Sequence, residues 1–220
     1  MTVDATRYGL VLAARRNAGD GGGYWRMNQF LMPFYTMIAP EIGGTITARA
    51  WVPMDDEHCI VFTISYRHNG MLTPEELLRF KRGEVGHALL IPGTTRPVAN
   101  KDNDYLIDRD IQKNVHFSGI KAIRAQDAAM SESAGPITDR SLEFLGTSDQ
   151  AIVRARRVML QAARNFVNGE NPEAMRGGEI YAVRSWSALL PGDTDYKDDV
   201  EVIRAMRTIS EQQQGRMVDA

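Results

Sequence analysis

The sequence has 220 residues, of which 43% are hydrophobic and 25% charged, and these values are typical of a globular protein with a sizeable core. Its net charge of −2 gives no general attraction to nucleic acid or to an anionic membrane, and no apolar run approaches the roughly 20 residues that a membrane-spanning helix needs. The single cysteine, Cys59, excludes an internal disulfide, and the N-terminus carries no secretion signal, so we expect a cytoplasmic protein.

The first third of the chain predicts an antiparallel sheet. Four segments are rich in β-branched and aromatic residues and are separated by short turns: residues 8–16, 24–38, 45–53 and 58–67. Pro33 interrupts the second segment. Strands that follow one another through short turns pair antiparallel, because a parallel pair needs a long crossover connection.

The remainder predicts helices and loops. Thr73 followed by Pro74 is a typical helix start. Residues 83–117 show no regular periodicity, which predicts a long loop of the kind that is usually functional or mobile.

Three further helices are predicted toward the C-terminus. One covers about residues 120–134 and stops at the Gly135-Pro136 pair. The clearest helix covers 148–168, because Thr147 and Gln150 have the spacing of a capping box. Its apolar stripe consists of Ile152, Ala155, Met159, Ala163 and Phe166. A last helix covers 196–210, and the polar tail 211–220 is expected to fray.

Asp127 is the residue that fits its surroundings least. At about 100° per residue, Ile123, Asp127, Met130 and Ala134 share an arc of roughly 60° on the 120–134 helix. A carboxylate within a buried apolar stripe must be paired, hydrogen-bonded or bound to a metal. The pattern alone favours a structural ion pair or a partner-helix contact, and the alternative is a metal ligand or a general base facing a cavity.

Several segments together resemble one family. They are residues 103–109 (NDYLIDR), 117–120 (FSGI), 126–140 (QDAAMSESAGPITDR) and 143–149 (EFLGTSD), with 30–35 (FLMPFY) and 52–58 (VPMDDEH) upstream in the same order. The chain is similar to the C-terminal catalytic domain of Rieske non-haem iron oxygenase α subunits, of the phthalate 4,5-dioxygenase and phenoxybenzoate dioxygenase type.

The resemblance implies an α+β fold of the helix-grip class, also called START-like or SRPBCC-like. In this fold a curved antiparallel sheet wraps around a long C-terminal helix, and we expect one such domain over residues 1–210. A substrate cavity lies between sheet and helix. Its predicted lining consists of Phe30, Met32 and Phe34, on one alternating face of a strand, with His116, Ile123 and Met130. By pattern alone, His116 is more often a satisfied loop residue.

The same resemblance implies an iron site and its partners. The family holds a mononuclear Fe(II) with two histidines and one aspartate, and Asp127 matches the aspartate. The two-histidine motif is absent here, and one cysteine cannot build the Rieske 2Fe-2S cluster. We therefore expect an N-terminally truncated chain, inactive alone, whose full-length form binds an aromatic substrate, receives electrons from a reductase or ferredoxin through a Rieske domain, and forms a trimer. The alternative is a metal-free helix-grip module that binds an apolar or aromatic small molecule.

Overall fold

The computed structural model describes residues 1–19, 21–172 and 177–207, which form two compact units. The first unit comprises Met1–Ala50, Ile64–His68 and the described residues from Phe144 onward. The second unit comprises Trp51–Thr63 and Asn69–Glu143. The expected single domain over 1–210 stays a prediction, and the predicted tail 211–220 lies outside the described residues.

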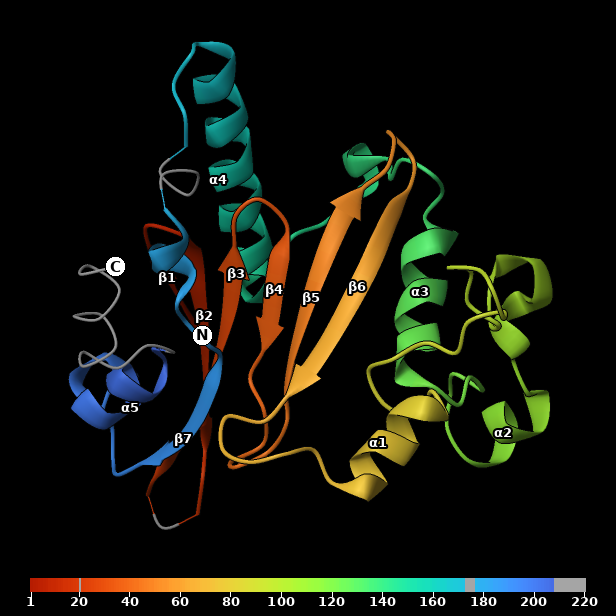
Figure 1. Cartoon of the computed structure of the whole chain (residues 1–220), viewed down its shortest axis with the longest axis horizontal. Coiled ribbons are helices and arrows are strands. Elements are labelled where there is room, and N and C mark those ends of the chain that lie inside the picture. The colour runs from red at the N-terminus through yellow and green to blue at the C-terminus, as the bar shows by residue number, and fades with distance from the viewer. Residues whose placement is uncertain (20, 173–176, 208–220) are drawn as a thin grey trace. The chain divides into compact units, whose positions relative to one another are not determined.

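A sheet of seven strands carries the fold, in the order β1-β2-β3-β4-β5-β6 with β7 paired to β3 (Figure 1). The pairs β1–β2, β2–β3, β3–β4, β3–β7 and β4–β5 are all antiparallel. The strands are β1 (Thr2–Ala5), β2 (Gly9–Asn17), β3 (Gly23–Leu31), β4 (Tyr35–Ile38), β5 (Ile46–Pro53), β6 (Cys59–Tyr66) and β7 (Trp186–Leu190).

Strand β3 is the centre of the first unit. Strand β2 pairs with it along one edge over its whole length. On the other edge, β7 pairs with residues 23–27 and β4 pairs with residues 29–31. Because side chains alternate along a strand, Trp25 and Met27 enter one hydrophobic cluster while Phe30 enters another.

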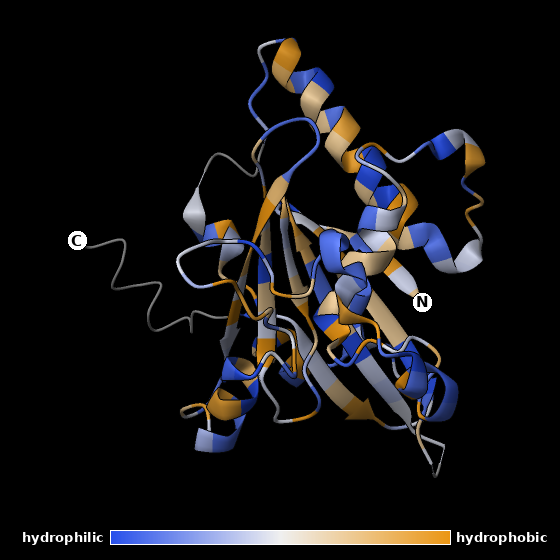
Figure 2. Cartoon of the chain, turned by 90° about the vertical axis from the view of Figure 1, so that its right-hand side faces the viewer, coloured by the Kyte–Doolittle hydropathy of each residue, from blue (hydrophilic) through white to orange (hydrophobic). Residues whose placement is uncertain are grey.

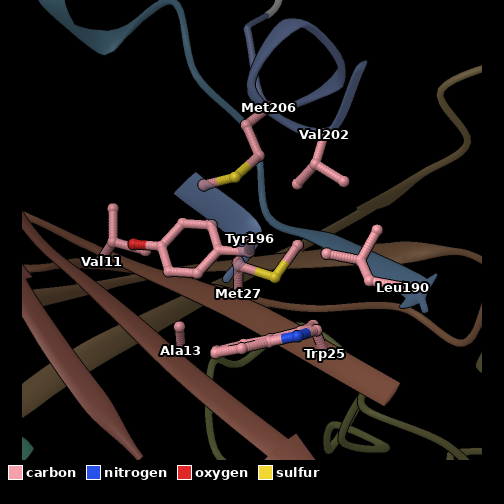
Figure 3. Packing of buried hydrophobic residues seen from close by; sticks show 8 residues of the cluster. All are labelled: Val11, Ala13, Trp25, Met27, Leu190, Tyr196, Val202 and Met206. Atoms are coloured by element: carbon pink, nitrogen blue, oxygen red, sulfur yellow. The ribbon is translucent and has the colours of Figure 1, made fainter. Parts of the chain in front are cut away.

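The first cluster packs the sheet against the C-terminal helix α5 (Val200–Ala205). Figure 3 shows the ring of Tyr196 among the side chains of Val11, Met27 and Met206. The rings of Trp25 and Tyr196 contact each other with their centroids 5.4 Å apart.

The predicted continuous helix from residue 196 is wrong in its described part. A short 3-10 helix, Tyr196–Asp198, comes first, and Asp199 then has an extended backbone. The Asp199 carboxylate accepts a hydrogen bond of 2.9 Å from the backbone N–H of Val202, so it caps a separate helix, α5. Residues 208–210 of the prediction lie outside the described residues.

The second cluster packs the sheet against the long helix α4 (Gln150–Val167). The helix approaches the cluster of Val3, Leu10, Phe30 and Met32 with the small residues Ala151, Ala155, Val158 and Ala162. The large apolar residues of the predicted stripe, Ile152, Met159 and Phe166, are exposed instead. Apolar and charged residues alternate around α4 in Figure 2, where it is the long helix at the top.

The predicted stripe is therefore rotated by about one residue from the contact face. Ala155 belongs to both, but its neighbours on the contact face are small, which lets the helix backbone come close to the sheet. The predicted capping box is also wrong. Residues Thr147–Asp149 form a 3-10 turn in which the Gly146 N–H donates to the Asp149 carboxylate at 2.8 Å.

The second unit contains the helices α1, α2 and α3, and it also includes the end of β5 and most of β6. Helix α1 (Pro74–Lys81) begins at the predicted Thr73 cap, and Glu76 completes a capping box with it. The predicted loop over 83–117 contains a 3-10 helix, Lys101–Leu106, and helix α2 (Arg109–Asn114), so that prediction is wrong in its second half. Helix α3 (Ile123–Ser133) follows close to its predicted place.

The predicted fold class is confirmed: the chain is α+β, with an antiparallel sheet and a long helix packed on it, as in the helix-grip class. No helix among the described residues is both long and apolar enough to cross a bilayer.

Candidate functional site

Helix α3 carries Asp127, the predicted metal ligand. The helix begins after the extended residue Ala122, which provides no side-chain cap. The Gln126 side chain donates to the Ile120 carbonyl at 2.6 Å, which ties the first turn to the preceding segment. Gly135, with a φ of 89°, follows the C-terminal end of the helix.

The face that carries Asp127 is exposed. Ile123 and Met130 expose 57% and 75% of their surface, Asp127 is also exposed, and no residue of α3 is buried. The predicted spacing holds, since these residues lie four and three positions apart on a regular helix. The prediction that this face is buried is wrong in the part of the chain that the structure describes.

Two side chains of α3 contact other residues of the second unit. The guanidinium of Arg124 lies over the ring of Trp51, 5.4 Å from its centroid. The Tyr105 hydroxyl donates to the Glu132 carboxylate at 2.5 Å. Burial, followed by this hydrogen bond to Glu132, raises the pKa of Tyr105 to about 12, so the phenol keeps its proton at neutral pH and donates.

His116 precedes α3 in the same unit and is half-buried. Its Nδ1 lies 3.0 Å from the Ser118 hydroxyl, which also lies near the backbone of Ile120. A histidine with such a local partner fits the structural alternative, and its place in a cavity stays a prediction.

The other predicted lining residues belong to the first unit. Phe30 and Met32 are buried together in the cluster that packs on α4. Phe34 is half-buried, and its ring contacts that of Tyr35 at 4.8 Å. The structure thus groups Phe30 with Met32, and it places Ile123 and Met130 on one helix of the second unit; a shared cavity stays a prediction.

The described residues do not fit a complete iron site. A facial iron site takes two histidines and one carboxylate from the protein. No cluster of three or more His, Cys, Asp or Glu that could hold a metal ion occurs within residues 1–19, 21–172 and 177–207. Asp127 can be at most one ligand of a site whose other ligands lie outside these residues.

Sequence reasoning did not single out Tyr105 as a contact of α3. The available signal was the position of Glu132, which the helical wheel places on the side of α3 away from Asp127. No local pattern indicated the residue that would meet it, because Tyr105 lies 27 positions earlier in the sequence.

Comparison with known proteins finds similarity along nearly the whole chain. Residues 1–216 match the model of the family described as LigXa C-terminal domain like. The 3-chlorobenzoate-3,4-dioxygenase oxygenase subunit of Comamonas testosteroni is 36% identical, over 90% of this chain and 49% of the relative. The phthalate 4,5-dioxygenase oxygenase subunit of Pseudomonas putida is 35% identical, over 90% and 46%. The chain spans about half the length of these relatives.

Proposed function

Because the chain belongs to the LigXa C-terminal domain-like family, we propose that it forms the C-terminal part of an aromatic ring-hydroxylating oxygenase subunit and contributes to its substrate and iron sites. The substrate class is an aromatic carboxylic acid. Support comes from the two relatives, whose names specify 3-chlorobenzoate and phthalate, both aromatic acids.

Asp127 supplies the carboxylate ligand of a mononuclear Fe(II). The observation that carries this assignment is the exposed carboxylate of Asp127 between Ile123 and Met130 on α3. The two histidine ligands come from polypeptide outside the described residues. When bound, the iron activates dioxygen; because the described residues do not complete its site, no chemical step is assigned to them.

The enzyme needs further parts. Electrons reach the iron from a reductase or ferredoxin through a Rieske domain with its 2Fe-2S cluster, and the complete subunit forms a trimer. Support for a separate electron donor comes from the relatives, which are named as oxygenase subunits of their dioxygenases. The half of each relative that this chain does not cover has room for the Rieske domain.

The test uses a chimeric subunit in which residues 1–216 of this chain replace the matched stretch of the Comamonas testosteroni relative. Iron content and 3-chlorobenzoate turnover are measured with that relative's reductase. The Asp127→Ala change is expected to remove the mononuclear iron and to lower turnover more than about 100-fold, because one of three protein ligands is lost.

Asp110→Ala is the matched control, since it removes an exposed carboxylate from another helix of the same unit. It is expected to leave iron content and turnover unchanged. An Asp127→Ala chimera that keeps its iron would refute the assignment even if turnover were too low to measure.

The second candidate is a metal-free helix-grip module for an apolar or aromatic small molecule. The observation that favours it is that the described residues contain no cluster of three or more His, Cys, Asp or Glu that could hold a metal ion. In this case the chimera would bind the aromatic acid without iron, and equilibrium dialysis with radiolabelled 3-chlorobenzoate would give equal binding with and without a chelator.

A further inference from the structure

A strained turn lies beside α3. Asp104, Tyr105 and Leu106 have φ values of 50°, 54° and 55°, so three successive residues other than glycine adopt the left-handed conformation. Such residues are rare even singly, because the Cβ atom is too close to the following carbonyl oxygen. They persist where the surrounding structure over-determines them, and they cluster at functional sites.

The surrounding hydrogen bonds do over-determine this turn. The Asn100 side chain accepts from the Asp102 N–H at 3.0 Å, and the Asn103 side chain accepts from the Asn100 N–H at 3.0 Å. The Asn100 carbonyl accepts from the Tyr105 N–H at 2.9 Å. Arg96 binds both Asn100 and Asp102 from outside. The loop is thus held as a rigid support.

The strained turn directs one side chain toward α3. Tyr105 exposes only 9% of its surface, whereas its neighbours Asp104 and Leu106 are exposed. Its hydroxyl reaches Glu132, which follows Asp127 by five positions and therefore lies about 140° around the helix from it. Arg124 and Gln126 hold the first turns of α3, and Glu132 holds its last turn.

We propose that Tyr105 and Glu132 are positioning residues that fix the rotation of α3 about its axis and so set the direction in which Asp127 points. The proposal rests on the proposed role of Asp127. A side chain lies about 5–6 Å from the helix axis, so a rotation of about 30° would move the Asp127 carboxylate by about 3 Å. Metal–ligand distances tolerate only about 0.2 Å, so this rotation would remove the carboxylate from a metal site.

The experiment measures the rotation of α3 directly in the 220-residue chain, without metal. Nitroxide labels are placed at Met130→Cys, on the Asp127 face, and at Glu75→Cys on α1 of the same unit, after Cys59→Ser removes the exposed native thiol. Pulsed electron paramagnetic resonance gives the distance distribution between the labels. Tyr105→Phe and Glu132→Leu are each expected to broaden this distribution or shift it by about 3 Å.

Two comparisons separate positioning from general stabilisation. Glu132→Gln keeps an oxygen that accepts from Tyr105, so it is expected to preserve the parent distribution that Glu132→Leu loses. Tyr181→Phe removes a tyrosine hydrogen bond of 2.8 Å, to the Met32 carbonyl in the first unit, and is expected to leave the distribution unchanged.

An unchanged distribution in Tyr105→Phe, with the chain folded by circular dichroism, would overturn the proposal. If Tyr105→Phe does not fold, equal distributions for Glu132→Gln and Glu132→Leu would overturn it. Because the distance measurement uses no metal, it can overturn the positioning role of Tyr105 and Glu132 while the iron measurement supports Asp127 as a ligand. Equally, the iron measurement can refute Asp127 as a ligand while the distance measurement gives the expected change.

Discussion

At the scale of single residues, the sequence predicted which side chains share a face but not what covers that face. Ile123, Asp127 and Met130 do lie together on α3, as the wheel requires. They are nevertheless exposed, whereas Arg124 contacts Trp51 and Glu132 accepts a hydrogen bond from Tyr105. An apolar stripe on a helix predicts a packing surface. It does not identify the residues that pack against that surface.

Tyr8 is part of a buried polar chain that sequence reasoning missed. Its hydroxyl donates to the Gln29 side chain at 2.8 Å, and Gln29, itself 1% exposed, donates to the Arg184 carbonyl at 3.0 Å. The signal was weak, because Gln29 occupies an ordinary inward position of a strand and its partners lie far away in the sequence. Burial raises the pKa of Tyr8 to about 12.

This pKa predicts a loss of stability at high pH. An unfolded tyrosine titrates near pH 10, so between about pH 10 and 12 the unfolded chain has released a proton that folded Tyr8 still holds. Rising pH therefore favours unfolding. The stabilisation that the protonated Tyr8 contributes is complete below about pH 10 and is lost as the pH rises through about 12. Tyr8→Phe is expected to reduce the fall in unfolding free energy across this range by about 2–3 kcal/mol.

The measurement is urea denaturation of both proteins at several pH values from about 9 to 12. Other tyrosines with raised pKa values, such as Tyr66 and Tyr181, titrate in both proteins and cancel in the difference. Identical pH profiles for the two proteins would show that Tyr8 is not protected from ionisation.

At the scale of elements, the sequence predicted β2 through β6 but missed β1, although β1 pairs with the neighbouring β2. Segments 8–16, 45–53 and 58–67 correspond to β2, β5 and β6, because short turns with a local signal separate them. The single predicted stretch 24–38 is two strands, β3 and β4, with Pro33 in the turn between them. Strand β7 was missed, since its partner β3 lies about 160 positions earlier and no local turn indicates the pairing.

The structure and the helical wheel assign different contact faces to helix α4, and two substitutions distinguish them. The wheel places Ala155 and Ala163 on one stripe, whereas the structure packs Ala155 against the sheet and exposes Ala163. Ala155→Asp is expected to lower the free energy of unfolding by about 3 kcal/mol, because it buries a charge against Phe30 and its neighbours. Ala163→Asp is expected to cost less than about 1 kcal/mol.

Chemical denaturation of the two variants gives the comparison. Helix propensity is the same at both positions, so the difference between the variants reports packing alone. Equal losses of stability would show that the contact face of α4 is the one that the wheel predicted.

At the scale of the whole molecule, the resemblance to the C-terminal domain of ring-hydroxylating oxygenases is confirmed by the family match and by both relatives. The fold class followed from that resemblance together with the pattern of strands and helices. The complete iron site could not be predicted from the sequence, because a metal site gathers ligands from distant parts of a sequence. This chain corresponds to only about half the length of its relatives. Helix α3 carries two carboxylates: Glu132 accepts a hydrogen bond from Tyr105, and Asp127 is exposed.

We propose that this chain contributes a single ligand to an iron site that other polypeptide completes. The most direct measurement is the amount of mononuclear iron bound per polypeptide after anaerobic loading with Fe(II) and desalting, for the 220-residue chain and for the chimeric subunit. We expect no stoichiometric iron on the chain alone and about one mononuclear iron per chimera, because the site needs three protein ligands. One equivalent of iron on the chain alone would contradict this proposal.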